Sequence, residues 1–493
     1  MPLDSQDALS DSVLSQLSDF ISSQVGLYFP RERWRDLERG ITTASHESSY
    51  TETESYVHWL LAARLTRTQI EELASHLTVG ETYFFREKRS LDILEQQIFP
   101  ELLHARAKTE KRLRIWSAGC CTGEEPYSIA MLLDRLIPDL AKWNVTILAT
   151  DINPRFLRKA TGGIYGEWSF RDTPDCVKAR YFTRRRDGRF EIWPRIRRMV
   201  TFSYLNLAED VYPSLVNNTN AMDVILCRNV LMYFAQDRAK MVIDRLQRTL
   251  VDGGWLVTSP AETSTLQFST FTTVEFPGAF LYRKVEDFGP RTDADRHQVP
   301  RHERETTGPY TSTLAEPSEP EVYSLARTAL TPEVWYRAGG LQAEKSESAH
   351  ELNARETSCR KARACANEGK LVEAIEWCEK AIVADKLNPA HYYLHAAICQ
   401  EQGRIETAER SLRHALYLDP DFALAHFTLG NLCLCLGRQQ EAQRHFGNAL
   451  TLLQACPADA HLPEADGLTA GRLTEIIVSV RATFRRAHKE LVA

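Results

Sequence analysis

The chain of 493 residues is 43% hydrophobic and 26% charged, with a formal net charge of −6. This length predicts two or three domains of ordinary globular composition, and the negative net charge excludes the basic excess of a nucleic-acid-binding protein. No apolar run reaches the roughly 18 to 20 residues of a membrane span, and the acidic N-terminus does not resemble a secretory signal. Eleven cysteines without a CxxC pair indicate buried, reduced thiols. We therefore expect a cytoplasmic protein that binds neither metal nor nucleic acid.

Residues 8–79 are predicted to be helical. Apolar side chains recur there at helical spacing, first from Leu9 to Ile21 and again from Tyr56 to Leu65. Several arginines gather in the same region: Arg31, Arg33, Arg35, Arg39, Arg64 and Arg67. From the sequence alone a solvated helix face accounts for these arginines slightly better. The alternative is a docking surface for an acidic partner.

Strands and helices alternate between residues 111 and 284. The candidate strands are Leu113–Ser117, Val145–Thr150, Met199–Tyr204, Asp223–Cys227, Trp255–Ser259, Thr272–Phe276 and Phe280–Lys284. Their order predicts a mostly parallel sheet with helices on both faces, closed by an antiparallel hairpin that turns at Pro277-Gly278. A second hairpin is predicted in the insert at 181–198, where Asp187-Gly188 lies between β-like segments.

Two neighbouring stretches predict a ligand site within this region. RIWSAGCCTGEEPYSIAMLL (114–133) is typical of a strand, a tight turn and a helix, and ILATDINP (147–154) ends a buried strand at Asp151. Backbone N–H groups at a helix start, together with a carboxylate that can accept both ribose hydroxyls, suit an adenosine-like ligand. There is no GxGxxG motif, and tight packing of small residues accounts for the turn about equally well.

The C-terminal part contains an internal repeat. Gly369, Gly403 and Gly437 are equally spaced, and so are two alanine series: Ala374, Ala408 and Ala442, and Ala381, Ala415 and Ala449. A period of about 34 residues with paired helices is the tetratricopeptide pattern, whose arrays present a concave groove to a peptide or helix. The alternative is an oligomerisation or purely structural array. Residues 286–350 are rich in Pro, Thr, Ser and Glu, and predict a disordered linker.

From residue 8 to about 285 the sequence resembles the CheR family of chemoreceptor glutamate methyltransferases. The resemblance lies in five stretches: VGETYFFRE (79–87), WSAGCCTGEEPYSIA (116–130), ATDINP (149–154), FSYLNL (202–207) and ILCRNVLMYF (225–234). It implies an α/β class I methyltransferase domain of the Rossmann-like kind, preceded by a small helical domain. The all-α tetratricopeptide extension is similar to the WspC-like branch of the family, which acts in surface sensing.

The resemblance implies S-adenosylmethionine as the methyl donor, and it gives roles to the matching residues. Thr82 and Arg86 would face the cofactor, with Arg86 near its methionine carboxylate. Asp151 would bind the ribose, and Tyr233 would lie near the transferring methyl group. The other implied cofactor-binding residues are Glu125, Asn206, Leu207, Arg228 and Asn229. Without the resemblance, purely structural roles stay open: a surface arginine for Arg86, a helix cap for Asp151 or Asn229, and a packed aromatic for Tyr233.

Three features depart from the family pattern. Residues 258–262 read TSPAE where the family often has glycine-histidine-serine-glutamate, which puts the role of that loop in doubt. The segment between Asn206 and Asp223 is several residues longer than usual. The insert hairpin turns through only 186–189, whereas members that bind a receptor's C-terminal pentapeptide have a longer, glycine-rich loop. We therefore predict that no pentapeptide tether is needed and that the repeats supply the tether instead.

The implied function is methyl transfer to glutamate side chains on the cytoplasmic helical bundle of a methyl-accepting chemoreceptor, which adapts a chemosensory, surface-sensing or biofilm pathway. A glutamate carboxylate with a pKa of about 4.3 is already ionised near neutral pH, so the enzyme must align the reactants rather than supply a general base. The alternatives are a methyltransferase of the same fold with another substrate, and a repeat scaffold with a vestigial cofactor domain.

The expected domains follow from the same reasoning. Residues 1–85 would dock the receptor, 86–285 would transfer the methyl group, and 286–350 would link them to the repeats. Residues 351–493 would hold about three repeats and a capping helix, which bind an unknown protein or peptide.

Overall fold

The computed structural model describes residues 9–50, 52–63, 65–108, 111–285 and 349–465, followed by 468–471, 473–474, 476–478 and 480–481. Among these residues no helix is both long and apolar enough to cross a membrane. The linker predicted at 286–350 lies outside the described residues except for its last two, which begin helix α13 (Ala349–Asn367). The described residues up to 285 and from 353 onward pack as one compact unit.

Helices α1 to α4 form the N-terminal part of the chain, as the spacing of its apolar residues predicts. They span Asp11–Gln24, Trp34–Glu47, Thr53–Ala62 and Arg67–Leu77. Helix α1 is capped by Ser10, whose hydroxyl accepts from Val13 N, and α4 is preceded by a capping box between Thr66 and Gln69. The fully buried core residues of these helices include Leu17, Ile21, Leu37 and Ile41. Burial of these apolar faces stabilises helices that are too short to be stable alone.

A seven-stranded sheet follows, in the order β6-β2-β1-β7-β8-β10-β9. Its strands are Arg112–Ala118 (β1), Asn144–Asp151 (β2), Val200–Tyr204 (β6), Met222–Leu226 (β7), Leu250–Val257 (β8), Phe271–Phe276 (β9) and Ala279–Lys284 (β10). Strands β6, β2, β1, β7 and β8 run parallel, and β10 is antiparallel to both β8 and β9. The predicted parallel sheet with a closing hairpin is therefore confirmed.

The predicted strand 255–259 differs most from the observed one, and the strand predicted at Asp223–Cys227 begins and ends one residue earlier. Strand β8 begins earlier than expected, at Leu250, and it ends at Val257 rather than at Ser259. The strand ends there because the Ser259 hydroxyl accepts from Glu262 N and caps helix α12 (Pro260–Thr265).

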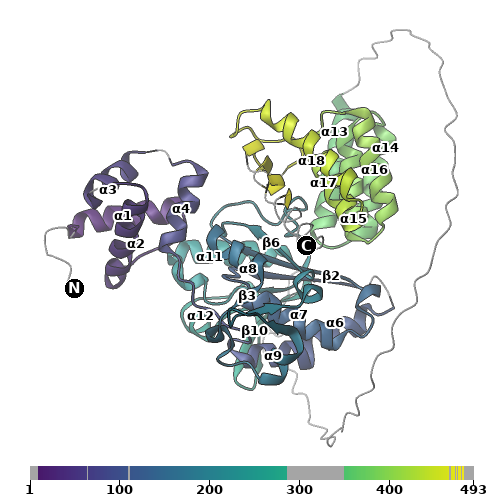
Figure 1. The fold of residues 1–493 in the computed structure, drawn as a ribbon. Coiled ribbons are helices and arrows are strands. Elements are labelled where there is room, and N and C mark those ends of the chain that lie inside the picture. The colour runs from purple at the N-terminus through teal and green to yellow at the C-terminus, as the bar shows by residue number, and fades with distance from the viewer. Residues whose placement is uncertain are drawn as a thin grey trace, which may run out of the picture. The chain divides into compact units, whose positions relative to one another are not determined.

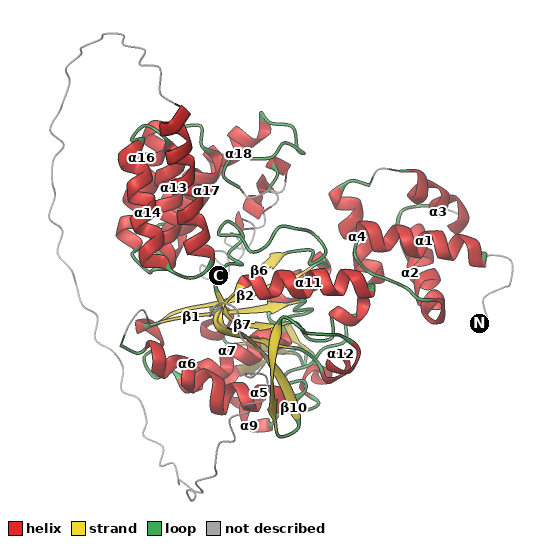
Figure 2. Cartoon of the chain, turned by 180° about the vertical axis from the view of Figure 1, so that it is seen from behind, coloured by secondary structure: helices red, strands yellow, loops and turns green. Residues whose placement is uncertain are grey.

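Helices cover both faces of the sheet (Figures 1 and 2). One face packs against α5 (Lys88–Ile93), α6 (Phe99–Arg106) and α7 (Glu124–Leu136), and the other packs against α11 (Gln236–Thr249). Helix α8 (Pro154–Gly162) lies beside β2 and β6. In β1, Leu113 and Ile115 belong to the first core, whereas Trp116 and Ala118 belong to the second, as the alternation of a strand requires.

The insert forms a small antiparallel sheet in the order β3-β5-β4. Its strands are Ile164–Tyr165 (β3), Phe182–Arg184 (β4) and Phe190–Ile192 (β5), with α9 (Asp175–Tyr181) before β4 and α10 (Pro194–Arg197) after β5. The predicted hairpin is confirmed, and Gly188 adopts a φ of +80° at its turn.

Helices α13 to α18 form consecutive pairs (Figure 1). After α13 they span Leu371–Ala384, Pro389–Glu401, Ile405–Leu418, Ala423–Cys435 and Gln439–Gln454. The repeated glycines lie in the turn inside each pair with φ between +74° and +79°, a left-handed conformation that suits glycine. All six repeated alanines are fully buried, where a larger side chain would separate the helices. The predicted tetratricopeptide array is confirmed.

Candidate functional site

A cavity of about 360 Å³ lies at the carboxyl ends of the parallel strands. Much of its lining comes from the segments that follow β1, β2, β6 and β7, where ligands bind in open α/β sheets. The nine residues that the sequence singled out all line this cavity: Thr82, Arg86, Glu125, Asp151, Asn206, Leu207, Arg228, Asn229 and Tyr233. The cavity therefore unites segments that are far apart in the sequence, while the role of each residue stays a prediction.

The turn after β1 brings backbone close to the cavity. Gly119 and Cys120 both donate their N–H groups to Thr150 O, which holds the turn against β2. Gly119 has a φ of +82°, and a Cβ built there would lie 2.3 Å from Val230 Cγ2. Gly123, at the start of α7, has a φ of +94°. A Cβ built at Gly123 would lie 2.8 Å from Ala160 Cβ, so both positions require glycine for its left-handed conformation and for close packing.

Asp151 ends β2 with a buried carboxylate that faces the cavity. Its two oxygens accept from Cys121 N and from Asn153 N, each at 2.8 Å. Burial raises the pKa of Asp151 to about 6, against the backbone hydrogen bonds that lower it. Asp151 does not cap the following helix, because Asn153 Oδ1 accepts from Arg155 N and Phe156 N at the start of α8.

Arg228 joins three parts of the cavity wall. Its guanidinium, with the side chain only 2% exposed, donates to Glu125 Oε2 and Glu87 Oε2 at 3.0 Å and to Arg86 O at 2.6 Å. Glu125 also accepts from Ser117 Oγ at 2.7 Å. These bonds fasten residues 86–87 to the start of α7 and the end of β1.

The surroundings of the Arg86 guanidinium differ from those of Arg228. Its Nη1 donates to Glu81 O at 2.6 Å, and within the described residues no carboxylate forms an ion pair with it. Its two neighbours, Phe85 and Glu87, have φ values of +60° and +52°, which L-residues adopt only when their surroundings impose it. Arg86 thus brings to the cavity a positive charge that no carboxylate of the described residues pairs with, on a tightly constrained segment.

Glu262 organises the segment that follows β7. Its carboxylate is fully buried and accepts from the backbone N–H groups of Asn229, Val230 and Leu231 at 2.7–3.0 Å. It also accepts from Ser259 N and Ser259 Oγ. The TSPAE loop, whose role the sequence left in doubt, therefore supports the 3₁₀ turn η5 (Leu231–Tyr233) and the left-handed Asn229, at φ +58°.

The N-terminal helical part also contributes to the cavity, through residues that the sequence reasoning missed. Tyr28 N donates to Tyr233 O at 2.8 Å, and Leu27 pairs with Phe234 in an isolated β-bridge. The Arg33 guanidinium lies 5.1 Å from the centroid of the Tyr233 ring. The short segment after α1 carries no motif, so only the fold reveals that it faces the site. Further missed lining residues are Val79, Cys121, Ile152, Phe156 and Met232.

Comparisons with known proteins agree with this geometry. The family model described as CheR methyltransferase, SAM binding domain, matches residues 80–278, and a tetratricopeptide repeat model matches residues 392–422. A chemotaxis protein methyltransferase of Borreliella burgdorferi is 30% identical over 51% of this chain and 87% of its own length. Chemotaxis protein methyltransferase 2 of Vibrio cholerae is 28% identical over 56% of this chain and 94% of its own.

A third relative extends the likeness beyond the methyltransferase region. The probable biofilm formation methyltransferase WspC of Pseudomonas aeruginosa is 29% identical over 76% of this chain and 84% of its own length. The sheet, the cavity at its carboxyl edge and these matches all indicate the same family. The chain belongs to the CheR family of S-adenosylmethionine-dependent methyltransferases and carries a C-terminal tetratricopeptide region.

Proposed function

We propose that this protein methylates glutamate side chains of a methyl-accepting chemoreceptor, giving glutamate methyl esters. The observation that carries the proposal is a single cavity that combines a buried carboxylate, Asp151, with an arginine that no carboxylate of the described residues neutralises, Arg86. The relatives named as chemotaxis protein methyltransferases supply the substrate class. The likeness to WspC favours a receptor of a surface-sensing or biofilm pathway.

The donor groups around the cavity fit S-adenosylmethionine. Asp151 would accept the ribose hydroxyls, because its oxygens keep lone pairs beyond the two backbone bonds. Arg86 would bind the methionine carboxylate by a charge-assisted hydrogen bond. Asn206 and Leu207, buried at the end of β6, would border the adenine, and Thr82 and Asn229 would complete the wall.

Two of the predicted cofactor residues would act through their neighbours. Arg228 and Glu125 bond to each other, and Arg228 also bonds to Glu87 and to the carbonyl of Arg86. We assign to this pair the positioning of Arg86, because the charges of Arg228 and Glu125 are already matched.

The cofactor supplies a methyl group made electrophilic by its sulfonium. The chain's own residues then have to hold an ionised glutamate carboxylate in line with that group, which needs no general base. Tyr233 would orient the carboxylate through its hydroxyl, and Arg33, packed over the Tyr233 ring, would attract it without binding it tightly. A tight salt bridge would make the carboxylate a poorer nucleophile.

We also propose that this enzyme recognises its receptor without a pentapeptide tether. The hairpin of the insert turns through Arg185 to Arg189, with Arg189 N bonded to Asp187 Oδ1 and Gly188 N to Arg185 O. This closed turn leaves no extended loop to hold a peptide strand. The C-terminal repeats would supply the additional contact with a partner.

The proposal is tested by incubating the full chain with methyl-labelled S-adenosylmethionine and membranes that contain the receptors. We expect label on a receptor-sized band, released by alkali as methanol, and lost in Arg86→Ala and Asp151→Asn. Arg248→Ala, an exposed arginine of α11, is the matched control and should retain activity. Cofactor binding without base-labile product would mean another substrate class, and an absence of cofactor binding would mean a scaffold.

A receptor that lacks its last five residues tests the tether. Methylation at the same rate as the intact receptor supports the proposal, and a large rise in KM contradicts it.

A further inference from the structure

Two arginines occupy the amino end of the central strand β1. Arg112 and Arg114 lie on the same side of the strand and are only 4% and 3% exposed. Central strands of parallel sheets are normally apolar on both faces, and burying a charge is costly unless it is paired. These two buried charges, at the end of the sheet opposite the cavity, therefore require partners that stabilise them.

The methyltransferase domain offers these arginines mostly neutral acceptors. The Arg114 guanidinium donates to Asn218 Oδ1 at 2.6 Å and to Asn220 O at 3.2 Å, and Arg112 Nη2 donates to Ala221 O at 3.3 Å. The nearby carboxylate of Asp223 is engaged elsewhere, because it binds the Arg106 guanidinium through both oxygens and accepts from the backbone N–H of Arg114.

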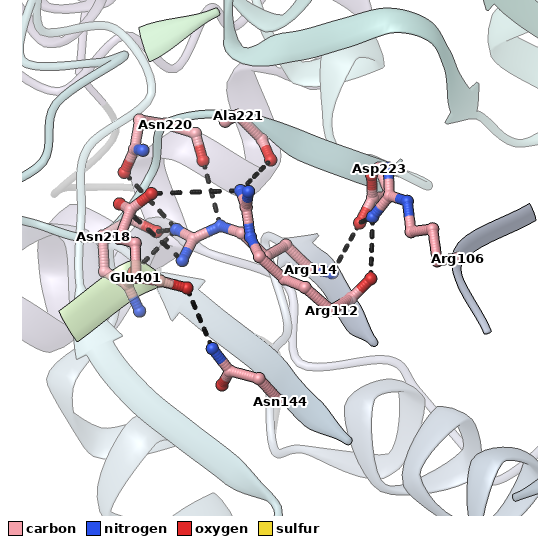
Figure 3. Close-up of polar contacts among 9 residues, drawn as sticks. All are labelled: Arg106, Arg112, Arg114, Asn144, Asn218, Asn220, Ala221, Asp223 and Glu401. Carbon is pink, nitrogen blue, oxygen red and sulfur yellow. Dashed lines mark hydrogen bonds and ion pairs between the residues drawn. The ribbon is translucent and has the colours of Figure 1, made fainter. Parts of the chain in front are cut away.

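A carboxylate of the tetratricopeptide array forms an ion pair with both arginines. Glu401, the last residue of α15, places its carboxylate 3.9 Å from both Arg112 Nη2 and Arg114 Nη1, with its side chain only 8% exposed (Figure 3). Its backbone carbonyl accepts from Asn144 Nδ2 at 3.0 Å. Glu401 therefore contacts the first residues of β1 and β2 at once.

Apolar contacts also join the methyltransferase domain to the repeats. Leu215 and Val216 pack against the core of the repeats. Both belong to the segment between Asn206 and Asp223, which is longer than the family usually has, and the same segment supplies the asparagines that bind Arg114.

The repeat turns add a third kind of contact. A Cβ built at Gly369 would lie 3.0 Å from Val251 Cγ1, and one at Gly403 would lie 3.9 Å from Asn144 Nδ2. The equivalent Gly437 has nothing within 4 Å among the described residues. The contact thus involves the first two repeats and leaves the turn of the third open.

We propose that Arg112, Arg114, Asn144 and the segment 214–221 form a docking site for the enzyme's own tetratricopeptide array, with Glu401 as the anchor. This docking face lies at the amino ends of the strands, whereas the cofactor cavity lies at their carboxyl ends. The array is therefore a fixed platform rather than a free tether, and a partner bound to it leaves the cavity open. This inference holds whatever the methylated substrate is.

The test uses the full chain with a specific protease site inserted at residues 287–352. After cleavage of the purified protein, the two fragments should co-elute from a gel-filtration column at physiological salt. Glu401→Arg, which would place a third cation beside the buried Arg112 and Arg114, should weaken the association of the fragments at least about tenfold. Glu406→Arg, an exposed glutamate at the start of α16, is the matched control and should leave the association unchanged.

Hydrogen exchange on the uncleaved chain distinguishes undocking from misfolding. In Glu401→Arg the amides of residues 214–221 should exchange faster, while those of β2 and of helices α15 and α16 keep their protection. Separation of the fragments in the unsubstituted protein would overturn the proposal. Equal effects of Glu401→Arg and Glu406→Arg, or loss of protection throughout the repeats, would overturn it as well.

Discussion

The two ends of the sheet use charged side chains in opposite ways. At the carboxyl ends, Asp151 and Arg86 face a cavity and keep unused hydrogen-bonding capacity. At the amino ends, Arg112 and Arg114 are closed over by Glu401 and by the loop that contains Asn218. Similar residue types thus make a ligand site at one end and an internal interface at the other. The difference is whether the opposite charge is supplied by the chain itself or left to a ligand.

The largest expected effect is at the cavity, in Gly119→Ala. The new Cβ would meet Val230 at 2.3 Å in a left-handed conformation, so we expect a loss of roughly 2–5 kcal/mol in stability, together with loss of cofactor binding. Thermal unfolding and calorimetry with S-adenosylmethionine measure both. Gly166→Ala, with φ −87° and nothing within 4 Å, is the matched control and should resemble the parent protein.

Glu262→Gln should give the next largest effect. An amide cannot replace a carboxylate that accepts from three consecutive backbone N–H groups, so the segment that carries Tyr233 should lose its shape. We expect kcat to fall at least about tenfold, or about 1.4 kcal/mol, with a smaller change in KM. The values of kcat and KM are measured under conditions in which circular dichroism shows that the variant is fully folded.

The matched control is Glu275→Gln, an exposed residue of β9. If Glu262→Gln and Glu275→Gln were equally active, Glu262 would have no positioning role.

The pH dependence of cofactor binding tests Asp151 directly. Because burial raises its pKa to about 6, the carboxylate is ionised above that pH and protonated below it. An ionised carboxylate accepts hydroxyl hydrogen bonds better, so affinity for S-adenosylmethionine should fall as pH decreases through about 6, by up to about tenfold per unit. Asp151→Asn should bind weakly and without this dependence. The same pH profile in both proteins would refute the role of Asp151.

The smallest effect is expected at the docking face. Leu215→Ala should weaken the association of the cleaved fragments by about 1 kcal/mol, or roughly fivefold, because it removes half-buried apolar surface. Val211→Ala is a matched control from the same loop, since Val211 packs against the core of the sheet instead. Cofactor binding should be unchanged in both variants. Equal weakening by both would show a general loosening of the loop.

The sequence predicted the carboxyl end of the sheet better than the amino end, for a physical reason. The strands, the Gly119 turn and the repeat glycines each have a local signature in period, turn chemistry or spacing. Arg112 and Arg114 have no such local signature, because Glu401, which pairs with both, is distant in the sequence and only the packed repeats bring it near. The contribution of Tyr28 and Arg33 to the cavity was missed for the same reason. The long segment before β7 was noticed, but its contacts could be known only from the fold.

The central claim, that ligand site and internal interface occupy opposite ends of one sheet, is tested most directly by measuring two properties in two variants. Calorimetry with S-adenosylmethionine and gel filtration of the cleaved chain are carried out on Asp151→Asn and Glu401→Arg. We predict that Asp151→Asn loses cofactor affinity with its fragments still associated, and that Glu401→Arg separates the fragments with its affinity intact. Loss of both properties in either variant would contradict the account.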